Sequence, residues 1–185
     1  MNAVSMDELA RVRAEADCLY TAAEVEAAVD RMALDITAKL ADRNPLMLAT
    51  MTGGMVMASL LLPRLEFPLE LDYLHLTRYG GNTSGGGIRW IKEPPPGVAG
   101  RCVLLVDDLL DYGLTLEAAV AGCRARRAEE VLTAVLVMKE IADRPGLART
   151  DFHALVTPDR YLFGYGMDYK HYWRNGGGIF AVKGR

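Results

Sequence analysis

Short apolar runs alternate along the chain with segments in which apolar residues recur at helical spacing. Two capping boxes, Ser5 to Glu8 and Thr21 to Glu24, pair a hydroxyl with a following glutamate and predict the starts of two helices. Strands are predicted at 46–51, 69–77, 88–92, 102–106, 131–138, 152–156 and 179–182, and further helices at 55–62 and 116–127. This alternation predicts an α/β fold with a mostly parallel twisted sheet flanked by helices.

The composition narrows the class of protein. A chain of 185 residues with 51% hydrophobic content can bury one core, so we expect a single domain over residues 1–185. A net charge of −3 argues against a basic surface for nucleic acid or anionic lipid, and no apolar run approaches the roughly 18 residues of a membrane span. The three cysteines are unpatterned, which fits reduced thiols. We therefore expect a soluble, cytoplasmic protein without nucleic-acid or membrane partners.

The most informative stretch is residues 101–120, RCVLLVDDLLDYGLTLEAAV. A buried strand ends in Asp107 and Asp108, residues 107–113 form a turn, and a helix follows; in an open α/β sheet, ligands bind at such a turn. Gly113 and Thr115 fit a phosphate held by backbone N–H groups at the helix N-terminus. The two aspartates are placed to bind ribose hydroxyls or a hard divalent cation. Alternatively, the two aspartates only stabilise a turn and bind no ligand.

The full motif is four apolar residues, two acids, two apolar residues and then Asp111-Tyr112-Gly113-Leu114-Thr115. It resembles the signature of type I phosphoribosyltransferases, which bind phosphoribosyl pyrophosphate (PRPP) and magnesium. The resemblance implies that residues 111–115 hold the ribose 5-phosphate, while Asp107 and Asp108 contact the ribose hydroxyls. It also implies a core of about residues 22–150 and a small hood subdomain built from the chain ends, about residues 1–21 and 151–185.

A second strand–glycine–helix unit occurs at Thr52-Gly53-Gly54. Its backbone N–H groups could bind another anion, although the glycines could equally serve only a tight turn. In the purine branch of the family, the corresponding loop holds pyrophosphate, contains a non-proline cis peptide and commonly has a basic residue where this chain has Thr52. Pyrophosphate contacts by Thr52 and Gly53 would therefore rely on N–H groups and a hydroxyl.

Residues 78–87 contain five glycines among polar residues, which predicts either a flexible hairpin tip or a mobile lid that excludes water from a site. The segment resembles the long flexible loop of hypoxanthine-guanine phosphoribosyltransferases, which carries a Ser-Tyr pair. Tyr79 matches that pair by position and would cover the reacting ribose. Arg78 is a departure that would add positive charge near pyrophosphate.

Residues on the base side also match the purine branch. Lys139 follows a predicted strand; the resemblance implies a hydrogen bond to the oxygen at C6 of the purine, whereas an isolated lysine there would be a solvated rim charge. Between residues 161 and 174, the resemblance implies that one aromatic stacks on the base, that the next residue reads the 2-position, and that an acid and an arginine bind magnesium and pyrophosphate. These residues are Tyr161, Leu162, Asp168 and Arg174. Without the resemblance, this segment would be interpreted as an aromatic core strand with incidental charges.

Taken together, the resemblance implies purine salvage: hypoxanthine or guanine reacts with PRPP to give IMP or GMP and pyrophosphate. Asp111 is the candidate base for the purine ring proton, and Mg²⁺ would be held by Asp107, Asp108 and Asp168. We also expect a homo-oligomer, either a dimer or a tetramer. Two alternatives stay open: a generic nucleotide-binding module, and a PRPP- or nucleotide-binding regulator with little activity, which the departures at Thr52, Tyr112 and Leu114 favour.

Overall fold

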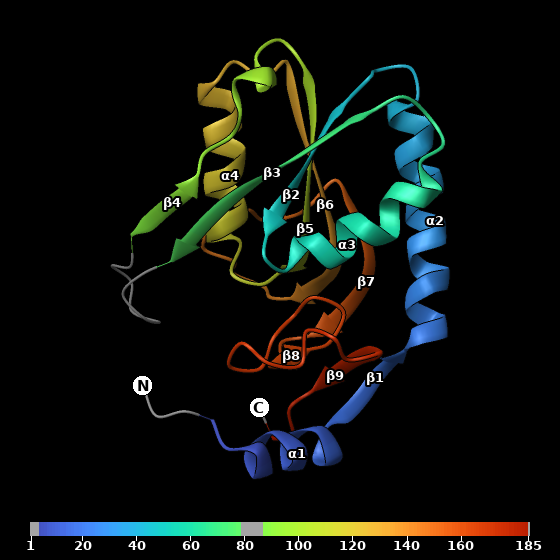
Figure 1. The fold of residues 1–185 in the computed structure, drawn as a ribbon, viewed down its shortest axis with the longest axis vertical. Coiled ribbons are helices and arrows are strands. Elements are labelled where there is room, and N and C mark those ends of the chain that lie inside the picture. The colour runs from blue at the N-terminus through green and yellow to red at the C-terminus, as the bar shows by residue number, and fades with distance from the viewer. Residues whose placement is uncertain (1–3, 79–86, 185) are drawn as a thin grey trace.

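The computed structural model describes residues 4–78 and 87–184, arranged as a large sheet between helices with a smaller sheet beside it (Figure 1). The large sheet has six strands in the order β4-β3-β2-β5-β6-β7. Neighbouring strands run parallel except for β3 and β4, so the predicted mostly parallel sheet is confirmed. Its strands are β2 (Leu46–Met51), β3 (Glu70–Arg78), β4 (Ile88–Lys92), β5 (Cys102–Leu110), β6 (Glu130–Glu140) and β7 (Phe152–Pro158).

Helices cover both faces of this sheet. The helices α2 (Ala22–Leu40) and α3 (Gly54–Leu61) pack on one face, and α4 (Leu114–Ala125) packs on the other. Because side chains alternate along a strand, Met47 and Ala49 of β2 enter the α2–α3 core while Leu46 and Leu48 enter the α4 core. Both capping boxes were expected to start helices, and helices begin beside Ser5 and Thr21. Two short 3₁₀ helices, η1 (Leu62–Arg64) and η2 (Pro96–Val98), lie in connections.

The parallel register brings the carboxyl ends of the central strands to one edge. Ala49 of β2 is paired with Val106 of β5, and Leu110 of β5 is paired with Met138 of β6. Strand β5 continues through Leu110, so the predicted turn at residues 107–113 is wrong for residues 107–110 and is confined to residues 111–113. The continued pairing with β6 holds residues 107–110 in extended conformation. The acid pair therefore sits on a rigid strand rather than on a loop.

A second sheet has three strands in the order β1-β9-β8. It joins β1 (Asp17–Thr21), β8 (Leu162–Phe163) and β9 (Gly178–Ala181), and α1 (Met6–Glu15) packs beside it. Strand β1, from the N-terminal part of the chain, and β9, from the C-terminal part, thus lie side by side below the carboxyl edge of the large sheet (Figure 1). Strand β7 belongs to the large sheet, beyond the expected core boundary at about residue 150. The division into core and hood stays a prediction.

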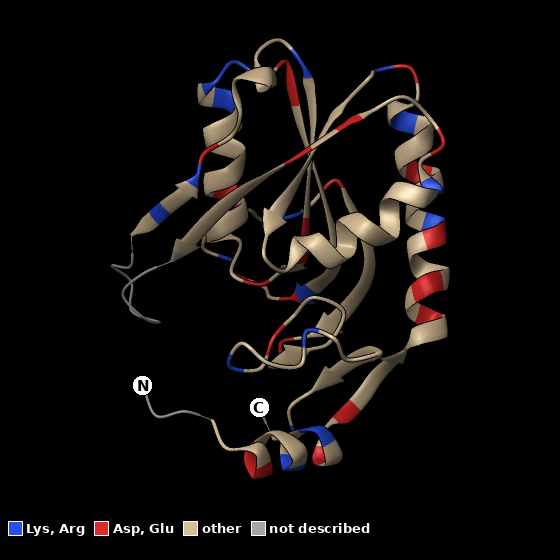
Figure 2. Ribbon diagram, viewed as in Figure 1, with Lys and Arg blue, Asp and Glu red and all other residues tan. Residues whose placement is uncertain are grey.

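Charge and hydropathy add two observations. On the face seen in Figure 2, acidic and basic residues are interspersed along α1 and α2 rather than gathered by sign. Within the described ranges, no helix is long and apolar enough to cross a membrane.

The predicted lid falls mostly on residues 79–86, which lie outside the described residues. Tyr79 is among these, and Arg78 is the last residue of β3.

Candidate active site

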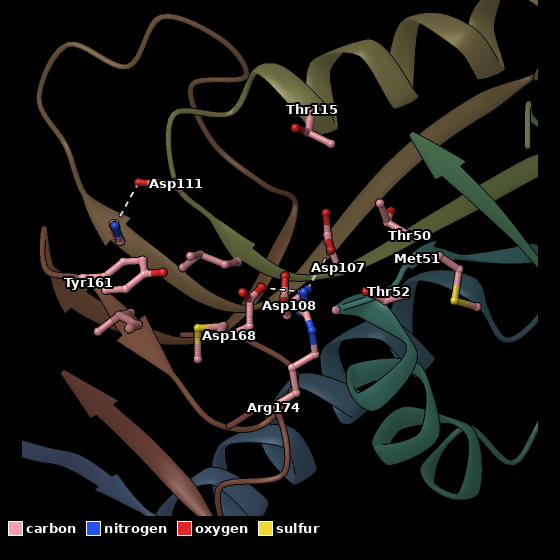
Figure 3. A pocket seen from close by; sticks show the side chains of 15 residues that line it. Thr50, Met51, Thr52, Asp107, Asp108, Asp111, Thr115, Tyr161, Asp168 and Arg174 are labelled. Atoms are coloured by element: carbon pink, nitrogen blue, oxygen red, sulfur yellow. Dashed lines mark hydrogen bonds and ion pairs between the residues drawn. The ribbon is translucent and has the colours of Figure 1, made fainter. Parts of the chain in front are cut away.

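A cavity of about 360 Å³ lies where the carboxyl ends of β2, β5 and β6 face the segment 161–174. Residues far apart in the sequence meet there, as the close view in Figure 3 shows. The predicted site residues that line the cavity are Thr52, Gly53, Asp107, Asp108, Asp111, Thr115, Lys139, Tyr161, Leu162, Asp168 and Arg174. The structure therefore brings together residues that the sequence pattern could only suggest as separate motifs.

A smaller adjoining cavity of about 140 Å³ lies at the N-terminus of α4. It is lined by residues 111–115, called here the phosphate loop, together with Asp107, Leu109 and Leu116. Gly113 caps the helix with φ of 77°, a left-handed conformation that favours glycine. The first N–H groups of a helix lack intrahelical acceptors and carry partial positive charge, so this cavity suits a phosphate.

The acid pair is buried, and this changes its proton affinity. Burial raises the pKa of Asp107 well above its usual value, and the adjacent charge of Asp108 raises it further. Burial also raises the pKa of Asp108, although the nearby Arg174 guanidinium opposes that rise. The Asp107 carboxylate accepts the Asp108 backbone N–H at 2.9 Å. Because successive strand residues face opposite sides, Asp107 lines both cavities, while Asp108 faces Gly53 and Arg174.

The loop after β2 closes tightly on the acid pair. A Cβ added to Gly53 would lie 1.9 Å from Asp108 Oδ2, so this position admits only glycine without displacing the carboxylate. The peptide bond between Met51 and Thr52 is cis, as the resemblance implied. Gly53 and Thr52 line the cavity beside the N-terminus of α3, where backbone N–H groups can meet a pyrophosphate.

Lys139 is the buried cation of the cavity, with only 7% of its side chain exposed. Its Nζ lies 3.0 Å from Asp111 Oδ1 and 3.2 Å from Asp159 Oδ1. The alternative of a solvated rim lysine is therefore wrong. Two carboxylates hold the ammonium, which has three donors, so one N–H is left for a ligand among the contacts described.

Tyr161 lines the cavity on the side of Asp111, away from Arg174 (Figure 3). Its ring meets the edge of the Tyr169 ring at 5.6 Å between centroids, and its hydroxyl accepts the Lys170 N–H at 3.3 Å. With 39% of its surface exposed, Tyr161 keeps a ring face available for stacking. The adjoining Leu162 is buried in β8, which fixes the backbone that follows Tyr161.

Arg174 and Asp168 form an ion pair beside the acid pair. The Arg174 guanidinium also donates to the Gly166 carbonyl, and its Nη1 lies 3.7 Å from Asp108 Oδ2. The other Asp168 oxygen accepts the His171 N–H at 2.6 Å. At this end of the cavity, the guanidinium is therefore held between two carboxylates.

The donor set fits magnesium held jointly with a phosphate ligand. Carboxylate oxygens of Asp107, Asp108 and Asp168 line one cavity, which suits a hard cation. Among the described residues, however, no group of three or more His, Cys, Asp or Glu side chains could hold a metal ion by itself. Magnesium commonly binds through one or two carboxylates plus substrate phosphates and water, which agrees with this arrangement.

Three contributors to the site escaped the sequence analysis. Asp159 holds Lys139, Arg144 donates to the carbonyls of Asp111 and Lys139, and Thr50 lines the cavity with a buried hydroxyl that has no partner among the described residues. Asp159 directly follows β7, and its pairing with Lys139 is a tertiary contact. No local pattern identified Arg144 or Thr50.

Known proteins resemble this chain over most of its length. The model of the phosphoribosyl transferase domain family matches residues 15–170. The hypoxanthine-guanine-xanthine phosphoribosyltransferase of Tritrichomonas foetus is 31% identical over 170 residues, covering 92% of this chain and 90% of that protein. The hypoxanthine-guanine phosphoribosyltransferase of Bacillus subtilis is 30% identical over 158 residues, covering 85% and 87%.

A solved structure agrees in fold. A hypoxanthine phosphoribosyltransferase from Staphylococcus aureus superposes with a TM-score of 0.86 at 21% identity and covers 97% of each chain. The family match, the identity to both relatives and the shared fold all extend across the phosphate loop and the acid pair. This chain therefore belongs to the phosphoribosyltransferase family, in its type I purine branch.

Proposed function

We propose that this protein transfers the phosphoribosyl group of PRPP to hypoxanthine or guanine, giving IMP or GMP plus pyrophosphate in purine salvage. One observation carries the choice of base: Lys139 is buried and held by Asp111 and Asp159 between the phosphate loop and Tyr161. A fixed ammonium at the base side of a PRPP cavity selects the exocyclic carbonyl oxygen at C6 over an amino group there. Both relatives are named for the same class of bases.

On the base side, each side chain has a distinct task. Tyr161 stacks on the purine ring, and the backbone at Leu162 meets the 2-position. Lys139 donates its remaining N–H to the oxygen at C6 and polarises it. Asp111 uses Oδ1 for Lys139, which leaves Oδ2 to accept the purine ring proton as the new bond forms.

On the PRPP side, anionic groups meet backbone N–H groups and one arginine. The phosphate loop holds the ribose 5-phosphate, and Thr52 and Gly53 meet the pyrophosphate. Asp107 and Asp108 bind the ribose hydroxyls. Arg174 sits where it can turn from Asp168 and Asp108 toward the departing pyrophosphate and stabilise its charge. Mg²⁺, when bound by Asp168 and the acid pair, would neutralise the same leaving group.

The displacement itself occurs at the anomeric carbon of PRPP. Positive charge of oxocarbenium character develops on the ribose, as in glycoside chemistry. The carboxylates of Asp107 and Asp108 lie beside the ribose position, where their negative charge stabilises part of this positive charge. Proton removal by Asp111 keeps the attacking ring nitrogen nucleophilic. The chain thus supplies positioning, charge complementarity and a base.

The test is the release of pyrophosphate from PRPP and magnesium with hypoxanthine, guanine, xanthine or adenine. We expect turnover with hypoxanthine and guanine and very poor turnover with adenine. A protein that binds PRPP or GMP but turns over none of these bases would instead be the nucleotide-binding regulator. Good turnover of adenine would contradict the role given to Lys139.

Assembly and location complete the proposal. Cys18, Cys102 and Cys123 are all free, which supports action in a reducing cytoplasm. We expect a homo-oligomer, dimer or tetramer, and sedimentation of the purified protein would test this. A monomer at assay concentrations would contradict it.

A further inference from the structure

The connection between β6 and β7, residues 141–151, lies behind the phosphate loop and has no role in the mechanism above. Its Arg144 donates from Nε to the Asp111 carbonyl at 2.6 Å, from Nη1 to the Ala148 carbonyl at 2.6 Å and from Nη2 to the Lys139 carbonyl at 2.5 Å. A planar guanidinium presents its donors in a rigid fork, so it fixes the relative positions of its acceptors. One side chain therefore ties the end of β6 to the start of the phosphate loop.

The backbone of this connection continues the contact. Gly146 donates its N–H to the Tyr112 carbonyl at 3.0 Å, and Leu147 donates to the Gly113 carbonyl at 3.2 Å. A Cβ on Gly146 would lie 2.4 Å from the Gly113 carbonyl carbon, so only glycine allows the two segments to approach this closely. Three consecutive carbonyls of the phosphate loop thus receive donors from one neighbouring segment.

This arrangement decides which way the phosphate loop points its donors. In a trans peptide the C=O and the following N–H point in opposite directions. The N–H groups of residues 112–114 therefore point away from the connection, on the side of the cavity at the α4 N-terminus. Within the part of the chain that the structure describes, these three N–H groups have no acceptor. Convergent N–H groups of this kind bind anions.

Arg144 lines neither cavity, so it does not touch the substrate itself. Nevertheless, the phosphate loop has Tyr112 and Leu114 where a basic side chain could have supplied charge. Resting on the proposed function, we propose that Arg144 is a positioning residue for the ribose 5-phosphate: it holds the carbonyls of the phosphate loop outward, so that the N–H groups face the anion. Backbone N–H groups, held in place by Arg144, thus bind the phosphate instead of a cationic side chain of the phosphate loop.

The test compares a nucleotide with its nucleoside, because the two ligands differ only in the phosphate. Binding of GMP and of guanosine is measured by calorimetry for the wild type, Arg144→Gln, Arg144→Lys and the control Arg149→Gln. Arg149 is an exposed arginine of the same connection. We expect both Arg144 variants to lose on the order of 10- to 100-fold in GMP affinity, as displaced contacts do, with a much smaller loss for guanosine. Arg149→Gln should match the wild type.

The two Arg144 variants separate positioning from charge. Lysine keeps the charge but cannot span three carbonyls, so wild-type GMP binding by Arg144→Lys would overturn the positioning role. Equal losses for GMP and guanosine, or unchanged GMP binding by Arg144→Gln, would also overturn it. Failure of the wild type to bind GMP would refute the proposed function instead, which keeps the two failures distinct.

Discussion

The ammonium of Lys139 lies 3.0 Å from Asp111 Oδ1, although the two residues come from different strand–loop units. The group that reads the purine oxygen and the group that takes the purine proton are therefore held by each other. Only 7% of the Lys139 side chain is exposed, whereas 39% of the Asp111 side chain is, so the ammonium is shielded while the carboxylate still faces solvent. Substitution of either residue should alter the other, and single substitutions need readouts that separate their roles.

Asp111→Asn should keep PRPP binding but lose on the order of 10²–10⁴ in kcat, the range for acid–base groups. Asparagine can still accept a hydrogen bond from Lys139, but it cannot accept the purine proton. Steady-state kinetics with hypoxanthine, together with PRPP binding by calorimetry, would measure this. Asp143→Asn, at an exposed site between β6 and β7, is the control. Unchanged kcat in Asp111→Asn would remove this residue from the mechanism.

Lys139→Gln should reduce the difference in kcat/KM between 6-oxopurines and adenine. An ammonium has donors only, so it pairs with the C6 oxygen but opposes the adenine amino group, and such a mismatch can reject a substrate by roughly 10⁴ or more. Glutamine can present a donor or an acceptor. The measurement is kcat/KM for hypoxanthine, guanine and adenine in the wild type, in Lys139→Gln and in the exposed control Lys39→Gln. An unaltered ratio in Lys139→Gln would show that another group reads the base.

Asp107→Asn should weaken PRPP binding but raise the thermal stability. Burial raises the pKa of Asp107 above its usual value, so the folded state favours the protonated form. The stability that protonation contributes is full below the ordinary aspartate pKa and is lost as pH rises through the raised value. Above the ordinary aspartate pKa, keeping the Asp107 carboxyl group buried therefore costs folding free energy, and a neutral amide removes that cost.

We expect Tm of Asp107→Asn to exceed the wild type by a few degrees at pH 8, since about 1 kcal/mol shifts Tm by roughly 2–4 °C in a chain of this size. The difference should shrink as pH falls toward 4. Scanning calorimetry at several pH values would follow it, with Asp143→Asn as the exposed control. A difference independent of pH would contradict the assignment to proton binding.

Tyr169→Phe should raise KM for the purine base about threefold to tenfold, as loss of one hydrogen bond does, with little change in KM for PRPP. The Tyr169 ring supports Tyr161, and its hydroxyl donates to Glu8 of α1 at 2.7 Å. This bond to Glu8 is the main reason that the pKa of Tyr169 is raised. Tyr172→Phe, an exposed tyrosine of the same segment, is the control. Equal rises in KM for the base and for PRPP would indicate a general loss of structure rather than a less well fixed Tyr161 ring.

The sequence predicted the large sheet because its central strands β2, β5 and β6 are largely apolar runs, β3 alternates, and α2 begins with a clear capping box. It missed β1, whose residues Asp17 and Cys18 are exposed and whose pairing with β9 depends on residues at the other end of the chain. It also ended β5 too early. The acids after Val106 suggested a turn, whereas pairing with β6 keeps them extended.

The site was predictable where its motif is local and unpredictable where a tertiary contact makes it. The phosphate loop and the acid pair follow from adjacent residues, and the structure places them together. The ion pair between Asp159 and Lys139 joins residues at the ends of two different strands. The sequence around either residue does not predict this pair. The hydrogen bonds of Arg144 likewise depend on the path of the connection between β6 and β7.

The pairing of β1 with β9 has a consequence for the order in which the protein can become active. Residues Asp17 and Ala181 are partners in this ladder, so almost the whole chain must be synthesised before the strand opposite β1 exists. The phosphate loop can form earlier, because β5, α4 and β6 are contiguous in the sequence. During translation, a nascent chain would therefore complete its phosphate loop and acid pair before Tyr161, Asp168 and Arg174 could join them. Only emergence of β9 from the ribosome would let β1 and β8 pair with it and bring these parts of the site together.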